Sequence, residues 1–322
     1  MAGIVNLFSI WGACVLDLFL GDPRSFPHPV IFIGKLISFL EKIIRKGAKT
    51  PVAQKAGGVV LTLATVLTVY LLTLGVLYIA KSIHIYFFYI LNLMLLWTCL
   101  AARSLQRASM QVFYPLVKGE MSLARQKLSY IVGRDTEELN EEEIAKATVE
   151  TVMENTSDGI IAPLFYMFMG GAPLAMAYKA VNTMDSMLGY RNEKYLHLGW
   201  ASAKLDDAAN FIPARITGIF LVVASFFLKY NYRGSFRILL RDRRNHLSPN
   251  CGYPEAAAAG ALDIQLGGTH TYFQETVFKP TLGDDLRPVE HRDIPRGVKM
   301  MYLSSWLVLG FFSMLLLALR FN

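Results

Sequence analysis

Three long apolar runs constrain this chain more than any other feature. They are residues 57–79, 83–101 and 301–319, and each is close to the ~20 apolar residues that a helix needs to cross a bilayer. Charge is scarce, since 53% of the 322 residues are hydrophobic and only 18% are charged. We therefore expect an all-α, polytopic integral membrane protein, because backbone embedded in lipid has to satisfy its own hydrogen bonds.

Three more apolar segments belong to this expected membrane part. Residues 4–20 lack the basic leader and small-residue cleavage site of a signal peptide, so we expect a retained span. The segments 159–181 and 211–229 are interrupted, the first by "GGAP" and the second by Pro213 and Arg215. Neither interrupted segment contains a clean run of full crossing length.

The polar stretch 182–210 lies between these two interrupted segments, and two topologies are open for it. If both segments cross fully, the stretch faces the outside of the cell. If both are broken or re-entrant helices, it lies in a water-filled cavity at membrane depth that opens inward.

Positive charge gathers beside the apolar runs, which is typical of the cytoplasmic side of a membrane protein. We expect two cytoplasmic inserts, a helical one at 103–158 and a helical or irregular one at 231–299, within a single membrane-embedded catalytic domain of residues 1–322. The net charge of +7 does not indicate nucleic-acid binding, because no groove-reading or base-stacking motif accompanies it. We therefore expect a multi-pass protein of the cytoplasmic membrane.

A capped helix carries the first row of acids. Asn140 followed by Glu143 has the spacing of a capping box. An apolar stripe at helical spacing then follows, formed by Ile144, Ala147, Thr148, Thr151 and Val152. Steps of four and seven residues nearly close whole turns, so Glu143, Glu150, Glu154 and Asp158 should project from one side of this helix.

Three polar clusters adjoin the interrupted apolar segments, where unpaired charge is costly and tends to mark a site. They contain Glu150, Glu154, Asn155 and Asp158; Asn182, Asp185, Arg191 and Asn192; and Lys204, Asp206, Asp207, Asn210 and Arg215. Carboxylate and amide oxygens suit Mg²⁺, which usually meets a protein through one or two carboxylates plus substrate phosphate oxygens. Arginine and lysine supply the complementary charge for a phosphate or carboxylate.

Several of these residues also fit a purely structural role. The acids after Glu143 could form a solvated helix face, and Arg215 could be a residue that snorkels to the lipid boundary. In "LDLFLGDPRSFPHPV", Arg24 and His28 could bind a phosphate, although an isolated histidine is more often structural.

Common site motifs are absent from the sequence. Cys14, Cys99 and Cys251 have no paired spacing, so neither a disulfide framework nor a thiolate metal site is supported. The chain also lacks GxxxxGK[ST], GxGxxG after a strand, GxSxG and CxxC. A nucleotide, if used, is not held by one of the common soluble nucleotide-binding motifs.

Long strings of the sequence nevertheless resemble one family, the integral-membrane adenosylcobinamide-phosphate synthases of cobalamin biosynthesis. The resemblance extends from about residue 16 to about residue 290 and rests on strings that follow the family's order. They include "LDLFLGDPRSFPHPV", "IVGRDT", "ENTSDG", "GYRN", "IPAR" and "SPNCGYPEAAAAGALDIQLGG". Cys251 departs from the pattern, since a smaller or more ordinary residue is expected there.

The resemblance implies an ATP-dependent amide ligase. Such an enzyme joins (R)-1-amino-2-propanol, or its O-phosphate, to a propionate carboxyl of adenosylcobyric acid to give adenosylcobinamide or its phosphate. A carboxylate forms an amide only after activation, so an acyl phosphate made from MgATP is expected. The implied partners are these substrates, the bilayer and, in addition, other membrane enzymes of corrinoid assembly. Because ATP and the corrinoid are cytosolic, the resemblance favours broken helices and an active site that faces the cytoplasm.

Individual roles follow as a hypothesis from this resemblance. Mg²⁺ and nucleotide phosphates are assigned to Glu150, Glu154, Asp158 and Asp185. Asp206 or Asp207 is assigned as a further ligand or as the base that deprotonates the amine. The residues expected to contact phosphate or substrate, or to orient them, are Arg24, His28, Asn155, Asn182, Arg191, Asn192, Lys204, Asn210 and Arg215.

Two rival classes are weighed against the ligase. Membrane CDP-alcohol phosphotransferases and polyprenyl transferases also bind a diphosphate through Mg²⁺, but their aspartate spacings are not reproduced here. A transporter or corrinoid-channelling scaffold would be favoured by paired inverted repeats, and the sequence shows none.

Overall fold

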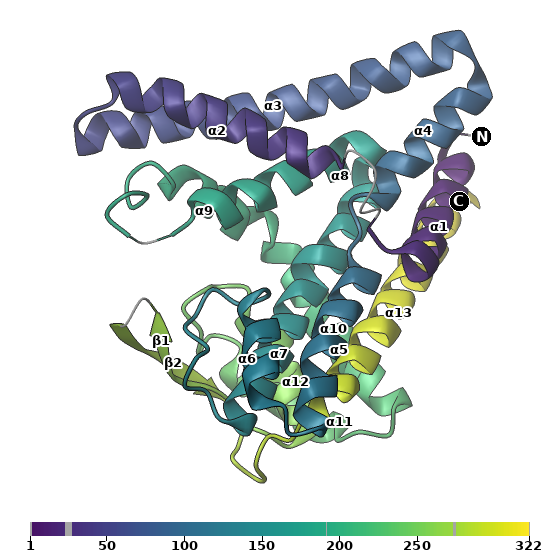
Figure 1. The fold of residues 1–322 in the computed structure, drawn as a ribbon. Helices are drawn as coiled ribbons and strands as arrows, with labels where there is room; N and C mark the ends of the chain where they lie inside the picture. Colours follow the sequence, from purple (N-terminus) through teal and green to yellow (C-terminus); the bar gives the residue numbers. More distant parts are fainter. Residues whose placement is uncertain (1, 23–27, 191, 273–274, 322) are drawn as a thin grey trace. The chain divides into compact units, whose positions relative to one another are not determined.

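The computed structural model describes residues 2–22, 28–190, 192–272 and 275–321 (Figure 1). Its backbone divides into two compact units. Unit 1 comprises Met1–Ala101 and Ala162–Asn210, and unit 2 comprises Ala102–Ile161 and Phe211–Asn322. Both units are predominantly helical, as expected from the sequence; a single catalytic domain formed by the whole chain stays a prediction.

Unit 1 consists of helices in the part of the chain that the structure describes. They are α1 (Ala2–Leu20), α2 (Pro29–Gly47), α3 (Pro51–Ile83), α4 (Ile85–Trp97), α8 (Ala162–Leu188) and α9 (Trp200–Ala209). The start of α3 follows directly from its sequence, because the Thr50 hydroxyl accepts a hydrogen bond from the Ala53 N–H at 3.2 Å and Pro51 occupies the first helical position. His28 and Pro29 begin α2 in the same way.

The helix α8 bends where the sequence predicts an interruption. Gly170 has φ −152° and ψ 20°, and Gly171 has φ 65° and ψ −158°, both outside the helical region. A positive φ is readily adopted only by glycine, and Pro173 cannot donate a helical hydrogen bond. The expected break in the segment 159–181 is therefore confirmed.

Unit 2 contains helices, one π-helical turn and a hairpin. Its elements are α5 (Ala102–Val117), α6 (Met121–Ser129), α7 (Glu141–Thr156), the π-turn η1 (Ser157–Ile161), α10 (Phe211–Phe227), α11 (Tyr232–Asp242), α12 (Gly252–Leu262), β1 (Leu266–Tyr272), β2 (Glu275–Leu282) and α13 (Asp293–Phe321). The predicted capping box of α7 is confirmed. Asn140 Oδ1 accepts from the Glu143 N–H at 2.9 Å, and Glu143 Oε2 accepts from the Asn140 N–H at 2.8 Å.

The antiparallel hairpin β1–β2 is the element that the sequence did not predict, because 231–299 was interpreted as helical or irregular. Leu266 pairs with Leu282 and Gly268 with Lys279, so the register shifts at Gly267. Gly267, Gly268 and Pro280 argue against a regular strand, and a strand that contains a bulge loses the simple alternation by which it is recognised.

Four helical runs of the described chain are long and apolar enough to cross a membrane. They are Pro51–Ile83, Ile85–Val117, Glu141–Leu188 and Asp293–Leu319. The predicted spans 57–79, 83–101 and 301–319 lie wholly or mainly within three of these runs. The predicted span 4–20 corresponds to α1, whose part Leu7–Leu20 is apolar but shorter than a crossing.

The interruption predicted within 211–229 is wrong in its position. Pro213 lies in the first turn of α10, where its missing N–H costs no hydrogen bond, so the helix continues to Phe227. The break falls at Asn210 instead, and α9 with α10 qualify as a span only as a bent pair.

The close packing of unit 1 predicts that Gly58 and Gly75 of α3 respond oppositely to alanine. A Cβ on Gly58 would lie 2.1 Å from the Leu198 carbonyl oxygen, whereas a Cβ on Gly75 would meet nothing within 4 Å. We expect Gly58→Ala to lower the free energy of unfolding by about 1–3 kcal/mol, as for overpacking. Gly75→Ala should be neutral or stabilise by up to about 1 kcal/mol through helix propensity. Unfolding of both variants in detergent measures this, and equal stabilities would contradict the packing.

Candidate functional site

Glu150 is the most firmly held acid of unit 2. Its Oε2 accepts a hydrogen bond from Arg134 Nη2, and its Oε1 accepts from the main-chain N–H of Gly267 at 2.8 Å. The side chains of Arg134 and Glu150 are only 6% and 7% exposed. A buried carboxylate keeps its charge only when it is paired and hydrogen-bonded, and both conditions are met here.

The bulge in the hairpin accounts for the contact with Gly267. Gly267 has φ 78°, and a Cβ at this position would lie 2.5 Å from the Pro280 carbonyl oxygen. A bulge releases one residue from the ladder and turns its peptide group away, which here places the N–H on Glu150. Only glycine fits this arrangement.

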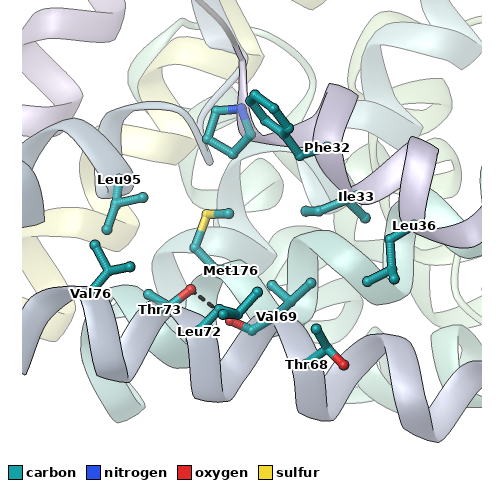
Figure 2. A pocket seen from close by; sticks show the side chains of 11 residues that line it. Phe32, Ile33, Leu36, Thr68, Val69, Leu72, Thr73, Val76, Leu95 and Met176 are labelled. Carbon is teal, nitrogen blue, oxygen red and sulfur yellow. Dashed lines mark hydrogen bonds between the residues drawn. The ribbon is translucent and has the colours of Figure 1, made fainter.

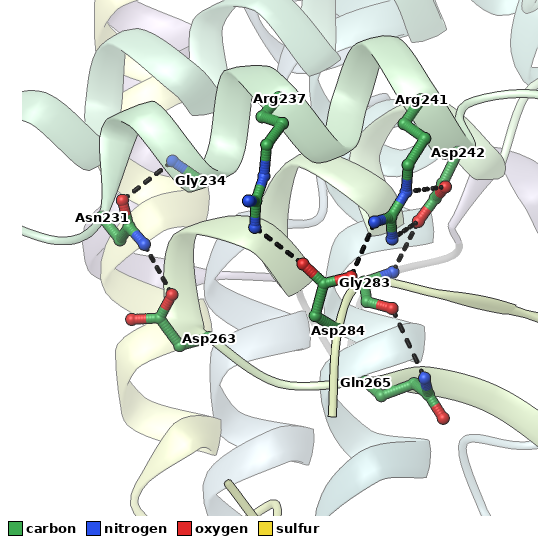
Figure 3. Close-up of polar contacts among 9 residues, drawn as sticks. All are labelled: Asn231, Gly234, Arg237, Arg241, Asp242, Asp263, Gln265, Gly283 and Asp284. Atoms are coloured by element: carbon green, nitrogen blue, oxygen red, sulfur yellow. Dashed lines mark hydrogen bonds and ion pairs between the residues drawn. The ribbon is translucent and has the colours of Figure 1, made fainter. Parts of the chain in front are cut away.

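A second ionic network fixes the other strand at this same open end of the hairpin to α11 (Figure 3). The Gly283 N–H donates to Asp242 Oδ2 at 2.8 Å, and Arg241 bridges Asp242 and Asp284 with hydrogen bonds of 2.7–2.8 Å. Arg237 also donates to Asp284 at 2.7 Å. Burial opposes ionisation of Asp242, but the hydrogen bonds from Arg241 and Gly283 outweigh it and lower the pKa of its carboxyl. The open end of the hairpin is therefore anchored through both strands, by Gly267 at the start of β1 and by Gly283 just after β2.

Glu154 follows Glu150 by one turn of α7 and contacts the thiol of Cys251. Cys251 Sγ donates to Glu154 Oε1 at 3.5 Å. Burial raises the pKa of the Cys251 thiol well above its usual value, and the negative charges of Glu154 and Asp158 raise it further. Cys251 is therefore a neutral, poorly nucleophilic thiol, and its role here is to contact a carboxylate.

His246 and Glu255 form a buried pair next to these acids. His246 Nε2 lies 3.8 Å from Glu255 Oε1, and the two side chains are 9% and 5% exposed. The Ser248 N–H donates to His246 Nδ1 at 3.0 Å, and this shorter contact favours a proton on Nε2 over one on Nδ1, which also lies 3.3 Å from the Ser248 carbonyl oxygen.

The protonation of this pair follows from its surroundings. Burial, and then the charges of Glu150 and Glu154, raise the pKa of Glu255 well above its usual value. Burial and the charge of Lys279 lower the pKa of His246. Both shifts favour the uncharged forms of the two groups, which limits the negative charge gathered around α7.

The acids differ in their access to solvent. Glu150 and Glu255 are buried, Asp158 is half-buried and Glu154 is exposed. The π-turn η1 contains Asp158, the last acid of this row, and such turns are frequent at functional sites. Glu154 and Asp158 are thus the carboxylates of this cluster that a ligand could reach.

Two further predicted residues of unit 2 have defined contacts. Asn155 Nδ2 donates to the Thr151 carbonyl oxygen at 2.9 Å, so its amide is turned along α7. The Arg215 guanidinium lies 3.4 Å from the Phe211 ring centroid and 4.4 Å from that of Tyr253, and Nη1 is 3.4 Å from Asn250 Oδ1. Arg215 is therefore held between two rings, which fits a cation placed within the protein better than one that merely snorkels.

Unit 1 holds a separate group of predicted residues around Asn210. Asn210 is 1% exposed, donates to Asp206 Oδ2 at 3.0 Å and accepts from the Tyr178 hydroxyl at 2.8 Å. Tyr166 stacks on Tyr178 with ring centroids 4.9 Å apart and donates to the Ala209 carbonyl oxygen. These contacts stabilise the end of α9.

The other predicted residues of unit 1 have mainly local contacts. Lys204 pairs with Asp207 at 3.2 Å on the surface, and Asn192 Oδ1 accepts from the Tyr195 N–H at 3.1 Å. A Cβ on Gly189 would lie 2.1 Å from Asp185 Oδ1, so the chain passes close to that carboxylate. The Ser186 hydroxyl donates to the main-chain carbonyl of Asn182 at 2.9 Å.

His28 has the contacts of a capping residue. Its Nδ1 accepts from the Val30 N–H at 3.3 Å, and its Nε2 lies 3.6 Å from Asp22 Oδ1. Arg24 and Arg191 lie outside the described residues. The phosphate-binding roles of all three stay predictions, as does the convergence of the acids of both units on one site.

Arg134, Cys251, His246 and Lys279 of the unit 2 cluster had no predicted role, whereas the sequence places Ser248 and Glu255 at a predicted helix N-terminus, where they could cap the helix or meet an anion. Arg134 and Cys251 lie within strings that carry the family resemblance, and Ser248 and Glu255 lie near the start of α12, where acids and hydroxyls are ordinary capping residues. His246 and Lys279 had no signal, because their places depend on a loop and on the unpredicted hairpin.

The fold and this cluster define a class: a polytopic helical membrane protein with a partly buried acidic site held by arginine. Comparison with known proteins identifies the family. The family model described as CobD/Cbib protein matches residues 10–301, so the chain belongs to this family and the resemblance seen in the sequence is confirmed. No solved structure matches the chain significantly.

Curated relatives match over nearly their whole length. Cobalamin biosynthesis protein CobD of Clostridium tetani is 51% identical over 304 residues, which cover 94% of this chain and 96% of the relative. CobD of Geobacter metallireducens is 52% identical over 290 residues, or 90% of each chain. Cobalamin biosynthesis protein CbiB of Salmonella choleraesuis is 48% identical over 300 residues, or 93% of this chain and 94% of the relative.

The geometry predicts that removal of Arg134 destabilises unit 2 strongly. Arg134→Gln leaves the buried Glu150 charge without its cation, so we expect a loss of about 3–5 kcal/mol in the free energy of unfolding. The exposed pair of Arg237 and Asp284 is the control, since Arg237 is 63% exposed and Arg237→Gln should cost about 0–1 kcal/mol. The double variant Arg134→Gln/Glu150→Gln should recover part of the loss. Unfolding in detergent tests this, and equal costs for the two arginine variants would contradict it.

Proposed function

We propose that this protein acts in cobalamin biosynthesis as an ATP-dependent amide ligase. It joins (R)-1-amino-2-propanol or its O-phosphate to a propionate carboxyl of adenosylcobyric acid. Membership of the CobD/Cbib family and the names of its relatives support the pathway. The observation that carries the reaction class is the graded acid row of α7 and η1, in which anchored Glu150 precedes the accessible Glu154 and Asp158.

The residues present fit a magnesium ion that is completed by phosphate. No group of three His, Cys, Asp or Glu side chains in the described residues could hold a metal by itself. Mg²⁺ needs only one or two protein carboxylates when substrate phosphates and waters supply the other oxygens. Glu154 and Asp158 would provide these carboxylates, and the ion would neutralise charge on the nucleotide.

In this proposal, Glu150 has a positioning role and does not bind the metal ion. Arg134 and Gly267 each occupy one of its carboxylate oxygens, so we assign it to positioning the start of the acid row. Burial favours the uncharged forms of Glu255 and His246, which limits the negative charge that would repel an anionic nucleotide. Asp185, Asp206 and Asp207 keep the roles predicted from the sequence.

The proposed reaction proceeds in two steps. A carboxylate oxygen of the corrinoid propionate attacks the γ-phosphorus of ATP, and ADP leaves. The amine nitrogen then attacks the acyl carbon, inorganic phosphate leaves, and a basic carboxylate takes the proton that the amine loses. Cations such as Arg215 would stabilise the charge that develops on phosphate oxygens.

Replacement of the accessible acid tests the reaction. Glu154→Gln keeps the size of the side chain and removes its charge, so we expect the rate of amide formation to fall by at least about 10²-fold. The fall should be larger at low Mg²⁺ concentration. The measurement is product formation from adenosylcobyric acid, aminopropanol phosphate and MgATP by purified protein at several Mg²⁺ concentrations.

An exposed acid outside the cluster provides the control. Glu138 is exposed and lies before α7, so Glu138→Gln should leave the rate and its Mg²⁺ dependence unchanged. An unchanged rate in Glu154→Gln would refute the role of this acid. ATP consumption that needs neither organic substrate would count against the ligase itself.

We also propose that the site opens to the cytoplasm of a multi-pass protein in the cytoplasmic membrane. Exposed Glu138 and Asn192 report on the two polar regions, and each can be replaced by cysteine. A membrane-impermeant thiol reagent should label neither position in intact cells and both in inverted vesicles. The wild-type chain gives the background of its own cysteines, and labelling of either position from outside would overturn this orientation.

A further inference from the structure

An apolar cavity of about 420 Å³ lies within unit 1 between α2, α3, α4 and α8 (Figure 2). Eleven residues line it, and among them only Thr68 and Thr73 carry a polar side-chain atom. Thr73 donates its hydroxyl to the Val69 carbonyl oxygen at 2.7 Å, so this group is satisfied by the helix itself. Ordered water needs two to four polar partners, which this lining does not offer, so its natural occupant is apolar.

The helix α2 beside this cavity has the pattern of a helix that lies in a membrane interface. Its exposed apolar residues Phe32, Phe39 and Ile43 recur at steps of seven and four, which places them in one stripe. The exposed lysines Lys35, Lys42 and Lys46 recur at the same steps and form a neighbouring stripe. An apolar stripe beside a basic one is typical of helices that bind anionic lipid surfaces.

The apolar cavity and the basic stripe of α2 lie next to each other at Phe32. Phe32 lines the cavity, and Lys35 Nζ lies 6.0 Å from the centroid of the Phe32 ring. Among the described residues, no ion pair joins Lys35, Lys42 or Lys46 to an acid, whereas Arg45 of the same helix pairs with Glu41 at 2.8 Å. Positive charge is thus available at the mouth of an apolar cavity.

We propose that unit 1 binds one anionic phospholipid, with an acyl chain in this cavity and the phosphate headgroup on Lys35 and Lys42. The charge of the lysine stripe selects the anionic headgroup, and the apolar lining selects the chain. The adjacent helix α3 is a candidate span of which 28% of the most apolar window is buried, so bilayer lipid has direct access to it. This site is independent of the proposed ligase reaction.

Native mass spectrometry of the full chain tests the site. The chain is reconstituted in vesicles of equimolar phosphatidylglycerol and phosphatidylcholine and then released. We expect one retained phosphatidylglycerol, preferred over phosphatidylcholine. Lys35→Gln/Lys42→Gln should reduce this preference by about fivefold per lysine, which is the contribution of one basic residue near an anionic surface. Lys118→Gln, in the polar part of the chain, is the charge control.

Filling the cavity separates this site from general lipid adhesion. Val69 is 7% exposed and lines the cavity, so Val69→Phe should abolish retention of the lipid. Leu71→Phe is the matched control, since Leu71 lies on the same helix, is 60% exposed and does not line the cavity. If size exclusion shows that Val69→Phe does not fold, Thr73→Leu replaces it.

Three outcomes would overturn the proposal. They are equal lipid retention by the cavity-filled and control chains, equal retention of both lipids by the wild type, or a lipid-free dimer in which a second copy covers the cavity.

Discussion

The ion pair between Arg134 and Glu150 is the interaction on which the arrangement of unit 2 depends. Glu150 lies on a helix that is buried over most of its surface, and a carboxylate there is tolerable only with a cation and a hydrogen-bond donor. Arg134 comes from the loop that precedes α7, and the Gly267 N–H comes from the hairpin. The charge of Glu150 therefore requires α7, the loop before it and the hairpin to assemble together. The hydrogen bond between Asp242 and Gly283 fixes the hairpin.

Burial of this pair has consequences for its neighbours. Burial, and then the charges of Glu150 and Glu154, disfavour a third charged carboxylate nearby, so the pKa of Glu255 is raised although it lies near a helix N-terminus. A helix dipole favours an anion by about 0.3–1 kcal/mol, which is too little to offset burial beside two carboxylates. Charge in the cluster thus concentrates on α7, and exposure then distinguishes the accessible Glu154 from the buried Glu150.

The sequence predicted the features that depend on neighbouring residues. The capping box of Asn140, the glycine break in α8 and the long apolar helices are set within one or two turns of chain. Arg134 and Gly267 could not be assigned in this way, because they reach Glu150 across 16 and 117 positions. The sequence did not predict the hairpin for a related reason. The bulge at Gly267, which directs the N–H to Glu150, also removes the alternating pattern by which a strand is recognised.

The two groups of predicted acids differ in what their contacts leave available. In unit 1 the side-chain amide of Asn210 donates a hydrogen bond to Asp206 and accepts one from Tyr178. These two hydrogen bonds stabilise the end of α9. In unit 2 the anchoring is done by Glu150, whereas within the described part of the chain Glu154 has a single, weak contact with the Cys251 thiol at 3.5 Å. A polyanion with its metal can replace a thiol contact at little cost, whereas it would have to break two good hydrogen bonds at Asn210. The contact of Glu154 is therefore easier to displace than the contacts of Asn210.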